Sequence, residues 1–300
     1  MKVLITGITG LVGRHLARVL SEQNYQIVGL SRRADLNKNI YKWDPLNEEI
    51  DLNVFNEIDG IIHLAGDNIA EGKWDSEKKR LIEESRTKST AFLVKKVLEL
   101  KVKPKFFISG SAIGYYGMNC GDELKDENSK AAHDFLAEVC YKWEEATKPL
   151  QDTLIRTCII RIGVVLTTQG AALKKMLKPF KLGLGGPVGS GKQFMSWISI
   201  EDLVNSIQFL IEKEKEGVFN CVSPEPIRNR QFSKTLGQVL KRPAIFPLPE
   251  FMVKLLFGEM GDTLLLSSTK VEPKNLLAEG FKFRYPELKK ALEYLIQFKK

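Results

Sequence analysis

Long apolar runs and paired cysteines are both missing from this sequence of 300 residues. No stretch of about 18 consecutive apolar residues occurs, so an ordinary membrane-spanning helix is excluded. The 4 cysteines lie far apart without a C-x-x-C pair, and only 3 histidines accompany them, so neither a disulfide framework nor a metal site is expected. No charged-then-apolar leader precedes the first strand pattern. We therefore expect a cytoplasmic protein with no metal and no membrane partner.

Acidic residues are scarce in the second half of the chain. Residues 1–150 carry 22 basic and 23 acidic side chains, whereas residues 151–300 carry 23 and 14, so the net charge of +8 comes from the second half. No run of Lys or Arg interleaved with aromatic residues occurs there. The charge therefore favours a small anionic molecule over nucleic acid as the partner. The oligomeric state stays open.

Short apolar segments alternate with helical stretches over the first 165 residues. Strands that are apolar throughout and separated by helices are typical of a parallel sheet covered on both faces, which is the doubly wound α/β (Rossmann) class. Beyond Leu166, glycines and prolines divide the chain into short elements. We predict a Rossmann domain over residues 1–165, to which residues 198–223 return. Residues 166–197 and 224–300 are predicted to form a smaller, mixed substrate-side domain.

Three glycines follow the first predicted strand at spacings of three residues. One glycine permits the tight turn, one lets the backbone approach a pyrophosphate, and one lets the following helix pack close to the strand. The free N–H groups of that helix face the anion. The segment is therefore predicted to bind a dinucleotide through Gly7, Thr9, Gly10, Leu11, Val12 and Gly13.

The second predicted strand ends in Ser31, Arg32 and Arg33, where a protein that binds NAD usually has an acidic residue for the ribose 2′-hydroxyl. A guanidinium can pair with a 2′-phosphate and stack on adenine. These residues therefore favour NADP as the cofactor. The alternative is that Asp35 binds the ribose and the arginines are merely solvated.

Later motifs resemble those of the extended short-chain dehydrogenases and reductases. The matching segments are residues 63–66 (HLAG), 109–112 (SGSA) with 115–117 (YYG), 161–165 (RIGVV), 197–204 (WISIEDLV) and 219–223 (FNCVS). More narrowly, Trp74, Arg86, residues 180–191 and the tail near residues 281–288 look like an atypical epimerase-like subgroup, whose members are labelled nucleoside-diphosphate-sugar epimerases. The resemblance implies a catalytic serine at Ser111 and further cofactor contacts at Leu64, Ala65, Gly66, Arg86, Ser109, Gly163, Val164 and Val165.

The catalytic pair of that family, Tyr-x-x-x-Lys in the helix after the serine, is missing. In the family the ammonium lowers the pKa of the phenol for proton transfer. Counting back from Trp143 puts the two positions near Leu136 and Cys140, neither of which moves a proton usefully. Tyr115 and Tyr116 are the nearest phenols and become candidates for a displaced acid or base, with structural roles as the alternative.

A glycine-rich segment ending in Lys192 reproduces the first seven positions of a P-loop. Gln193 stands where the Ser or Thr would hold Mg²⁺, so an NTPase is not expected. A loop that closes over an anionic substrate is the better interpretation, with a solvated loop as the alternative. The predicted substrate contacts are Lys73, Trp74, Lys192, Trp197 and Arg228.

Together these features predict an NADP(H)-binding oxidoreductase or epimerase that acts on a small, anionic, sugar-nucleotide-like substrate. The alternative is a non-catalytic regulatory protein that senses NADP(H). The missing Tyr/Lys pair is the main support for that alternative.

Overall fold

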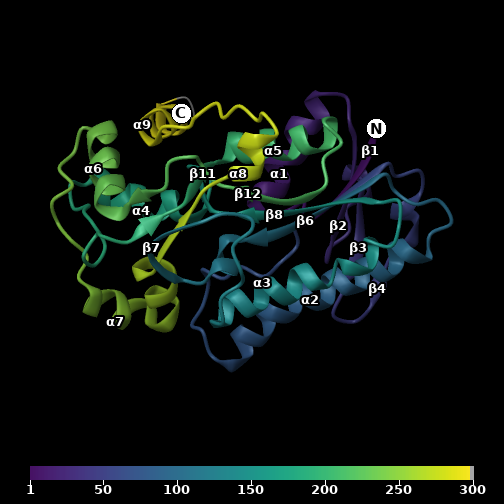
Figure 1. Cartoon of the computed structure of the whole chain (residues 1–300), viewed down its shortest axis with the longest axis horizontal. Helices are drawn as coiled ribbons and strands as arrows, with labels where there is room; N and C mark the ends of the chain where they lie inside the picture. The colour runs from purple at the N-terminus through teal and green to yellow at the C-terminus, as the bar shows by residue number, and fades with distance from the viewer. Residues whose placement is uncertain (298–300) are drawn as a thin grey trace.

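The computed structural model describes residues 1–297. A twisted sheet crosses the middle of the molecule and helices cover both of its faces (Figure 1). The strands are β1 (Lys2–Thr6), β2 (Gln26–Ser31), β3 (Ile40–Asp44), β4 (Glu49–Ile50), β5 (Gly60–His63), β6 (Phe106–Ala112), β7 (Asn119–Lys125), β8 (Arg156–Ile162), β9 (Val164–Leu166), β10 (Phe194–Met195), β11 (Trp197–Ser199), β12 (Gly217–Cys221), β13 (Ile227–Arg228) and β14 (Ser268–Val271).

The α-helices are α1 (Leu11–Glu22), α2 (Ser76–Glu99), α3 (Phe135–Glu145), α4 (Ala171–Lys181), α5 (Ile200–Glu212), α6 (Asn229–Leu240), α7 (Glu250–Gly261), α8 (Lys274–Ala278) and α9 (Leu288–Gln297). A 3-10 turn, η3 (Ile113–Tyr116), follows β6. None of the helices in residues 1–297 is long and apolar enough to cross a membrane.

The main sheet has 8 strands in the order β12-β8-β6-β5-β1-β2-β3-β4. All pairs are parallel except β3 with β4, which forms an antiparallel edge. The strand order runs outward in both directions from β1, so the strand ends on either side of β1 diverge and leave room for a ligand. The predicted doubly wound α/β fold is confirmed.

Alternate residues of β1 enter different cores, as expected for a strand buried on both faces. Val3 and Ile5 pack in the core beneath α1 and α5, whereas Leu4 packs in the core beneath α2. Figure 1 shows α1 and α5 on one side of the sheet and α2 with α3 on the other. The sheet therefore holds the ends of its strands rigidly between two apolar layers.

A third core joins α4, α6 and α9 at one end of the molecule. It contains Leu173, Leu177, Trp197, Phe232 and Leu292. Three two-stranded sheets, β10-β13, β11-β9 and β14-β7, border this region. Although β12 lies late in the chain, it pairs with β8 in the main sheet. The exact division into domains stays a prediction.

Two details of the strand pattern could not be read from the sequence. The apolar segment that ends at Leu166 is divided between β8 and β9 at Gly163. The backbone packs so tightly there that a Cβ on Gly163 would lie 2.6 Å from the carbonyl oxygen of Ser196. The turn-rich segment after β2 also contains the short strands β3 and β4. These edge strands are short and rich in charged or polar residues, so the sequence carries little apolar periodicity there.

Candidate functional site

In the glycine-rich turn after β1, backbone atoms lie so close together that Gly7 and Gly13 have no room for a side chain. Gly7 has a φ of +68°, and a Cβ on it would lie 2.8 Å from the carbonyl carbon of Leu64. A Cβ on Gly13 would lie only 2.2 Å from the carbonyl oxygen of Gly7. Gly10 is the N-cap of α1 and makes no side-chain cap, so no side chain of the cap covers the first N–H groups of this helix. This arrangement suits an anion at the helix N-terminus.

A buried chain of hydroxyls and an imidazole fixes the strand end beside that turn. Thr6 Oγ1 accepts hydrogen bonds from the N–H groups of Leu64 and Ala65, each at 3.1 Å, and lies 2.7 Å from His63 Nδ1. His63 Nε2 lies 2.9 Å from Thr90 Oγ1 on α2. Burial lowers the pKa of His63 to about 3. The imidazole is therefore neutral and positions the backbone of Leu64 and Ala65.

Four arginines line one cavity beside the end of β2. This cavity, of about 1290 Å³, is lined by Ser31, Arg32 and Arg33, and also by Arg14 and Arg18 from α1. Arg32 and Arg33 are exposed and form no ion pair within residues 1–297. The alternative ribose ligand, Asp35, also lines the cavity but pairs with Lys38 at 2.9 Å. The geometry therefore provides guanidinium groups for an anion at this position. Arg14 was not predicted from the sequence, because only the helical turn brings it to the end of β2.

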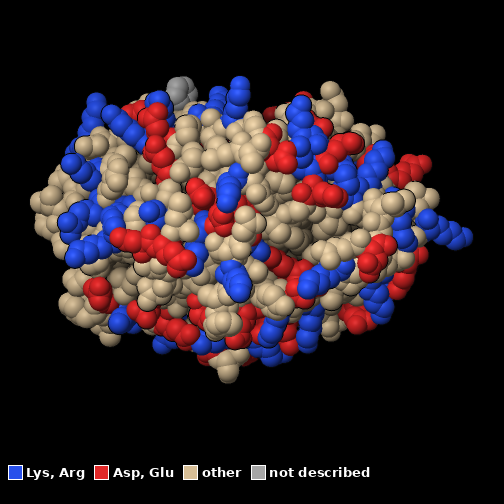
Figure 2. All heavy atoms as spheres, viewed as in Figure 1, with Lys and Arg blue, Asp and Glu red and all other residues tan. Residues whose placement is uncertain are grey.

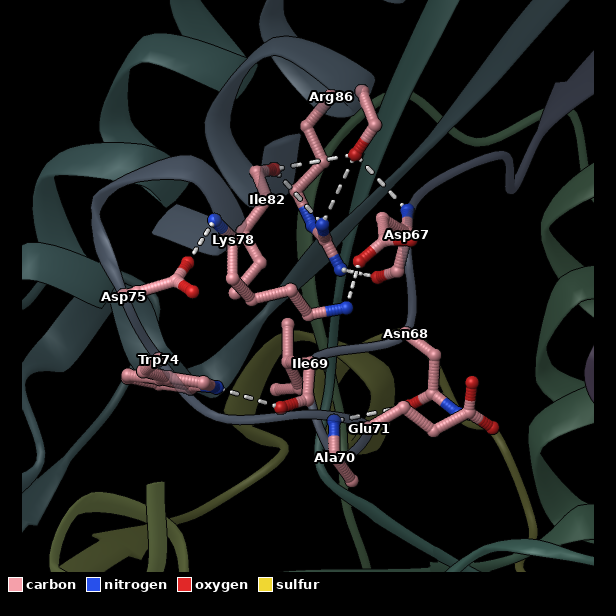
Figure 3. A network of polar contacts seen from close by, with 11 residues as sticks. Asp67, Asn68, Ile69, Ala70, Glu71, Trp74, Asp75, Lys78, Ile82 and Arg86 are labelled. Carbon is pink, nitrogen blue, oxygen red and sulfur yellow. Dashed lines mark hydrogen bonds and ion pairs between the residues drawn. The ribbon is translucent and has the colours of Figure 1, made fainter. Parts of the chain in front are cut away.

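The loop after β5 is fastened to α2 by polar contacts (Figure 3). Arg86 donates to the carbonyl oxygens of Asp67 and Ile82, each at 2.9 Å, and Lys78 pairs with the carboxylate of Asp67. Burial lowers the pKa of Arg86. A Cβ on Gly66 would lie 3.3 Å from the Arg86 guanidinium carbon, so Arg86 lies directly behind Gly66. The predicted residues Gly66 and Arg86 are thus brought together.

Ser111 belongs to a buried ionic network at the end of β6. Its Oγ donates to Glu144 Oε1 of α3 at 2.6 Å. Arg161 of β8 binds both carboxylate oxygens of Glu144, at 2.9 and 2.8 Å. Although burial lowers the pKa of Arg161, the hydrogen bonds and charge of Glu144 raise it overall. The Ser111 hydroxyl therefore faces a carboxylate held in place by a permanent cation.

Tyr116 and Tyr115 contact the same arginine in different ways. The Tyr116 hydroxyl is 2.8 Å from an Arg161 Nη and donates to Asn220 Oδ1 at 2.7 Å. Burial raises the pKa of Tyr116 to about 12. The ring of Tyr115 covers the Arg161 guanidinium, with 3.4 Å between its centroid and the guanidinium carbon. The Tyr116 phenol is thus fully engaged within the protein, and a structural role suits it better than proton transfer.

The two residues predicted at the positions of the Tyr/Lys pair lie in apolar surroundings. Leu136 packs with Trp74, Ile82 and Val139. Cys140 is buried, and this burial raises the pKa of its thiol to about 12. Neither side chain can exchange a proton near neutral pH.

The predicted substrate contacts do not form one cluster. Lys192 and Arg228 line a common cavity of about 610 Å³, where Arg228 pairs with Asp122 at 2.8 Å. Lys73 is exposed. Trp74 and Trp197 are buried, and their indole N–H groups already donate to the carbonyl oxygens of Ile69 and Glu225. The two tryptophans therefore serve as core residues, and we do not retain them as substrate contacts.

Comparisons with known proteins agree with this geometry. The family model described as "NAD dependent epimerase/dehydratase family" matches residues 3–221, and a model described as "Domain of unknown function (DUF1731)" matches residues 248–295. The chain belongs to the NAD-dependent epimerase/dehydratase family. The predicted resemblance to an epimerase-like subgroup is thereby confirmed.

The matches to individual relatives cover nearly the whole of both chains. The chain is 36% identical over 97% of its length to Epimerase family protein Mb2239 of Mycobacterium bovis, and covers 96% of it. It is 34% identical to Epimerase family protein YfhF of Bacillus subtilis, covering 100% of this chain and 99% of that protein. The crystal structure of human epimerase family protein SDR39U1 (isoform2) with NADPH superposes with a TM-score of 0.92, at 33% identity and 99% coverage of both chains.

The remaining predicted cofactor residues lie in or next to three strands. Ser109 is buried in the middle of β6, beside His63 at the end of β5, whereas Gly163 follows β8 and Val164 and Val165 belong to β9. The sequence did not indicate Glu144 or Asn220, which reach the site from α3 and β12. A glutamate on a helix is common in any sequence, so Glu144 becomes a candidate only because the fold places it beside Ser111.

Proposed function

We propose that this protein binds NADP(H) and exchanges hydride with a hydroxyl or carbonyl group of a small, anionic, sugar-nucleotide-like substrate. The observation that carries the proposal is the cavity beside β2, where Arg14, Arg32 and Arg33 converge. A cluster of guanidinium groups suits the 2′-phosphate that distinguishes NADP from NAD. A relative of 33% identity was crystallised with NADPH, which supports the same choice here.

The backbone of the residues predicted to touch NADP(H) leaves space for the pyrophosphate of the cofactor. Gly7, Gly10 and Gly13 leave the backbone free of Cβ atoms at the N-terminus of α1. Thr6 holds the backbone N–H groups of Leu64 and Ala65 by hydrogen bonds. Arg86 packs against Gly66. When bound, the nicotinamide supplies or accepts the hydride.

Ser111 and Glu144 supply the proton route that the absent Tyr/Lys pair would otherwise provide. The Ser111 hydroxyl already donates to Glu144, so its lone pairs are free to accept a proton from a substrate hydroxyl. As the substrate O–H bond breaks, its proton passes to Ser111 Oγ and the original Ser111 proton passes to Glu144 Oε1. Arg161 keeps Glu144 oriented throughout. The reverse transfer protonates a carbonyl oxygen during reduction. Tyr115 stays a second candidate for a proton donor.

Lys192 and Arg228 are proposed to meet the negative charge of the substrate, because they line one cavity. Lys73 lies outside this cavity and is exposed, so it stays a separate candidate for a substrate contact. The division into a Rossmann domain and a substrate-side domain follows from the same assignment.

Fluorescence titration with NADPH and NADH tests the cofactor. Wild type is expected to prefer NADPH, and Arg32→Ala is expected to lose about tenfold or more in NADPH affinity with little change for NADH. Arg18→Ala is the matched control, because Arg18 lines the same cavity but pairs with Glu22 at 2.7 Å. Equal losses for both cofactors in Arg32→Ala would refute the assignment to NADP.

Transfer of deuterium from 4-deuterated NADPH to a panel of sugar nucleotides, aldehydes and ketones tests the chemistry. Transfer to any member that disappears in Ser111→Ala supports the proposed enzyme. Tight NADPH binding without transfer to any member would instead favour a protein that senses NADP(H), for which Leu136 and Cys140 at the positions of the catalytic pair are the structural argument.

A further inference from the structure

Two segments of the second half contain no acidic residue at all. Thr153–Ile200 and Pro226–Pro249 together hold 12 Lys and Arg side chains and neither Asp nor Glu. The two segments meet in space, because α4 and α6 pack in one core. Arg156 and Arg161 lie apart from this contact, in β8, where they pair with Glu214 and Glu144. The cations of α4, α6 and the turn after α6 lie at one end of the molecule, and Figure 2 shows Lys and Arg gathered at its left end, where α6 lies in Figure 1.

The Lys and Arg side chains at this end of the molecule form one row on α4 and one on α6, which we call the α4 and α6 stripes, and two more lie in the turn after α6. Lys178 and Lys181 are exposed on α4, and Arg230 and Lys234 are exposed on α6. Lys241 and Arg242 follow α6, and Arg242 Nε donates to the carbonyl oxygen of Lys181 at 3.1 Å, which ties the stripes together. None of these six cations has a carboxylate within 4.0 Å in the described part of the chain.

A shallow groove of about 700 Å³ runs along the α6 stripe. Arg230, Lys234, Lys241, Arg242 and Ile245 line it, together with small or uncharged residues. No carboxylate of residues 1–297 lines the groove, so none of these residues offsets the positive potential at its surface.

Large apolar side chains protrude beside these cations. Leu182 and Leu184 are 66% and 60% exposed, and Ile245 and Phe246 are 71% and 52% exposed. The Phe246 N–H donates to the carbonyl oxygen of Gly185 at 3.1 Å, so both apolar pairs lie on adjoining loops. Phe251 and Leu255 of α7, which follow closely in the chain, are 69% and 81% exposed. We call the six cations, with Leu182, Leu184, Ile245 and Phe246, the basic-apolar face.

We propose that the basic-apolar face lies on the surface of an anionic lipid bilayer. Lysines and arginines attract anionic headgroups, while adjacent exposed leucine, isoleucine and phenylalanine side chains gain by entering the boundary between headgroups and acyl chains. Nucleic acid would use the cations but would give exposed aliphatic side chains no apolar environment. We expected no membrane partner because the sequence has no apolar stretch long enough to span a bilayer. A protein that lies on the surface of a bilayer needs no such stretch.

Sedimentation with vesicles tests this proposal independently of cofactor binding and catalysis. The probe is a vesicle of phosphatidylcholine containing about one third phosphatidylglycerol, and a vesicle of pure phosphatidylcholine is the comparison. The protein is expected to partition to the anionic vesicles at about 0.1 M salt and to leave them as salt rises. Absence of binding to the anionic vesicles, or equal binding to both kinds, would overturn the proposal.

Two variants separate the contributions of charge and apolar contact. Lys181→Gln/Lys234→Gln/Lys241→Gln is expected to lower the partition coefficient roughly a hundredfold, at about fivefold for each lysine. Leu184→Ser/Ile245→Ser/Phe246→Ser is expected to lower it at least tenfold at unchanged charge. The matched controls change residues outside this face, Lys101→Gln/Lys130→Gln/Lys213→Gln and Val102→Ser/Leu154→Ser, and are expected to bind as wild type does.

These substitutions alter exposed side chains, so a thermal melt of each variant confirms that it is folded. If the serine variant binds anionic vesicles as tightly as wild type, the face is a general polyanion site and the bilayer proposal fails. Binding to duplex DNA that exceeds binding to anionic vesicles at the same salt concentration would lead to the same conclusion.

Discussion

Glu144 and Arg161 face each other with two parallel hydrogen bonds, and their side chains are only 12% and 4% exposed. The pair joins α3 to β8 beneath Ser111. Two opposite charges that leave water together lose solvation, which the paired hydrogen bonds offset only while both partners are present. Removal of one partner therefore exposes the full cost of burying the other.

Arg161→Met is expected to lower the free energy of unfolding by about 3–5 kcal/mol, because Glu144 stays buried without its cation. The double variant Glu144→Leu/Arg161→Met should recover much of that loss, since no uncompensated charge remains. Arg18→Met, which breaks an exposed pair with Glu22, should cost less than about 1 kcal/mol. Urea unfolding of the four proteins checks this, and a double variant no more stable than Arg161→Met would contradict it.

Tyr116→Phe and Tyr115→Phe are expected to differ in stability. The Tyr116 hydroxyl contacts an Arg161 Nη and Asn220 Oδ1, so its removal takes one partner from each of these two buried atoms and should cost about 1–3 kcal/mol. Tyr115→Phe keeps the ring over Arg161 and should change stability by less than about 0.5 kcal/mol. Thermal melts of both variants decide the matter. Equal melting temperatures would show that the Tyr116 hydroxyl is not a structural group.

The sequence predicted the parts of the site that depend on local geometry. The glycine spacing at Gly7, Gly10 and Gly13 predicted a turn between a strand and a helix, which the structure has between β1 and α1, and the apolar strands identified the sheet. The network around Arg161 could not be predicted in this way. Its members come from η3, α3, β8 and β12, and Tyr116 and Asn220 lie 104 residues apart. Such partners meet only through the packing of the whole fold.

Stability is expected to fall in acid because of His63. Burial lowers the pKa of His63 to about 3, well below its ordinary value of 6.5, so the folded state favours the neutral ring. The unfolded chain takes up a proton near pH 6.5 while the folded protein does not. The stabilisation is therefore complete above pH 6.5 and is lost as the pH falls towards 3, with about 2 kcal/mol lost by pH 5.

Chemical unfolding of wild type and His63→Gln at pH 7.5 and pH 5 measures this contribution. The amide cannot be protonated in this range, so the variant should lose about 2 kcal/mol less than wild type between the two pH values. Parallel pH profiles for the two proteins would show that His63 does not carry the effect. In the folded wild type, the ¹⁵N resonances of this ring should stay those of a neutral imidazole down to pH 5.

Gly10→Ala and Gly13→Ala are expected to separate cofactor binding from folding. A Cβ on Gly13 would meet the backbone oxygen of Gly7 at 2.2 Å and the Cα of Ile8 at 2.8 Å, so the strand and α1 must move apart. This variant should lose about 1–3 kcal/mol of stability as well as cofactor affinity.

Gly10 has an extended backbone, with φ −75° and ψ 175°, which alanine adopts readily, and it is exposed. A Cβ on Gly10 would lie 3.0 Å from the carbonyl oxygen of Gly7, a contact that a small shift of the turn relieves. Gly10→Ala should therefore unfold within about 1 kcal/mol of wild type, yet bind NADPH at least tenfold more weakly because its methyl group occupies the space proposed for the pyrophosphate. Urea unfolding and NADPH fluorescence measure the two effects. Wild-type affinity in a folded Gly10→Ala variant would place the pyrophosphate away from this turn.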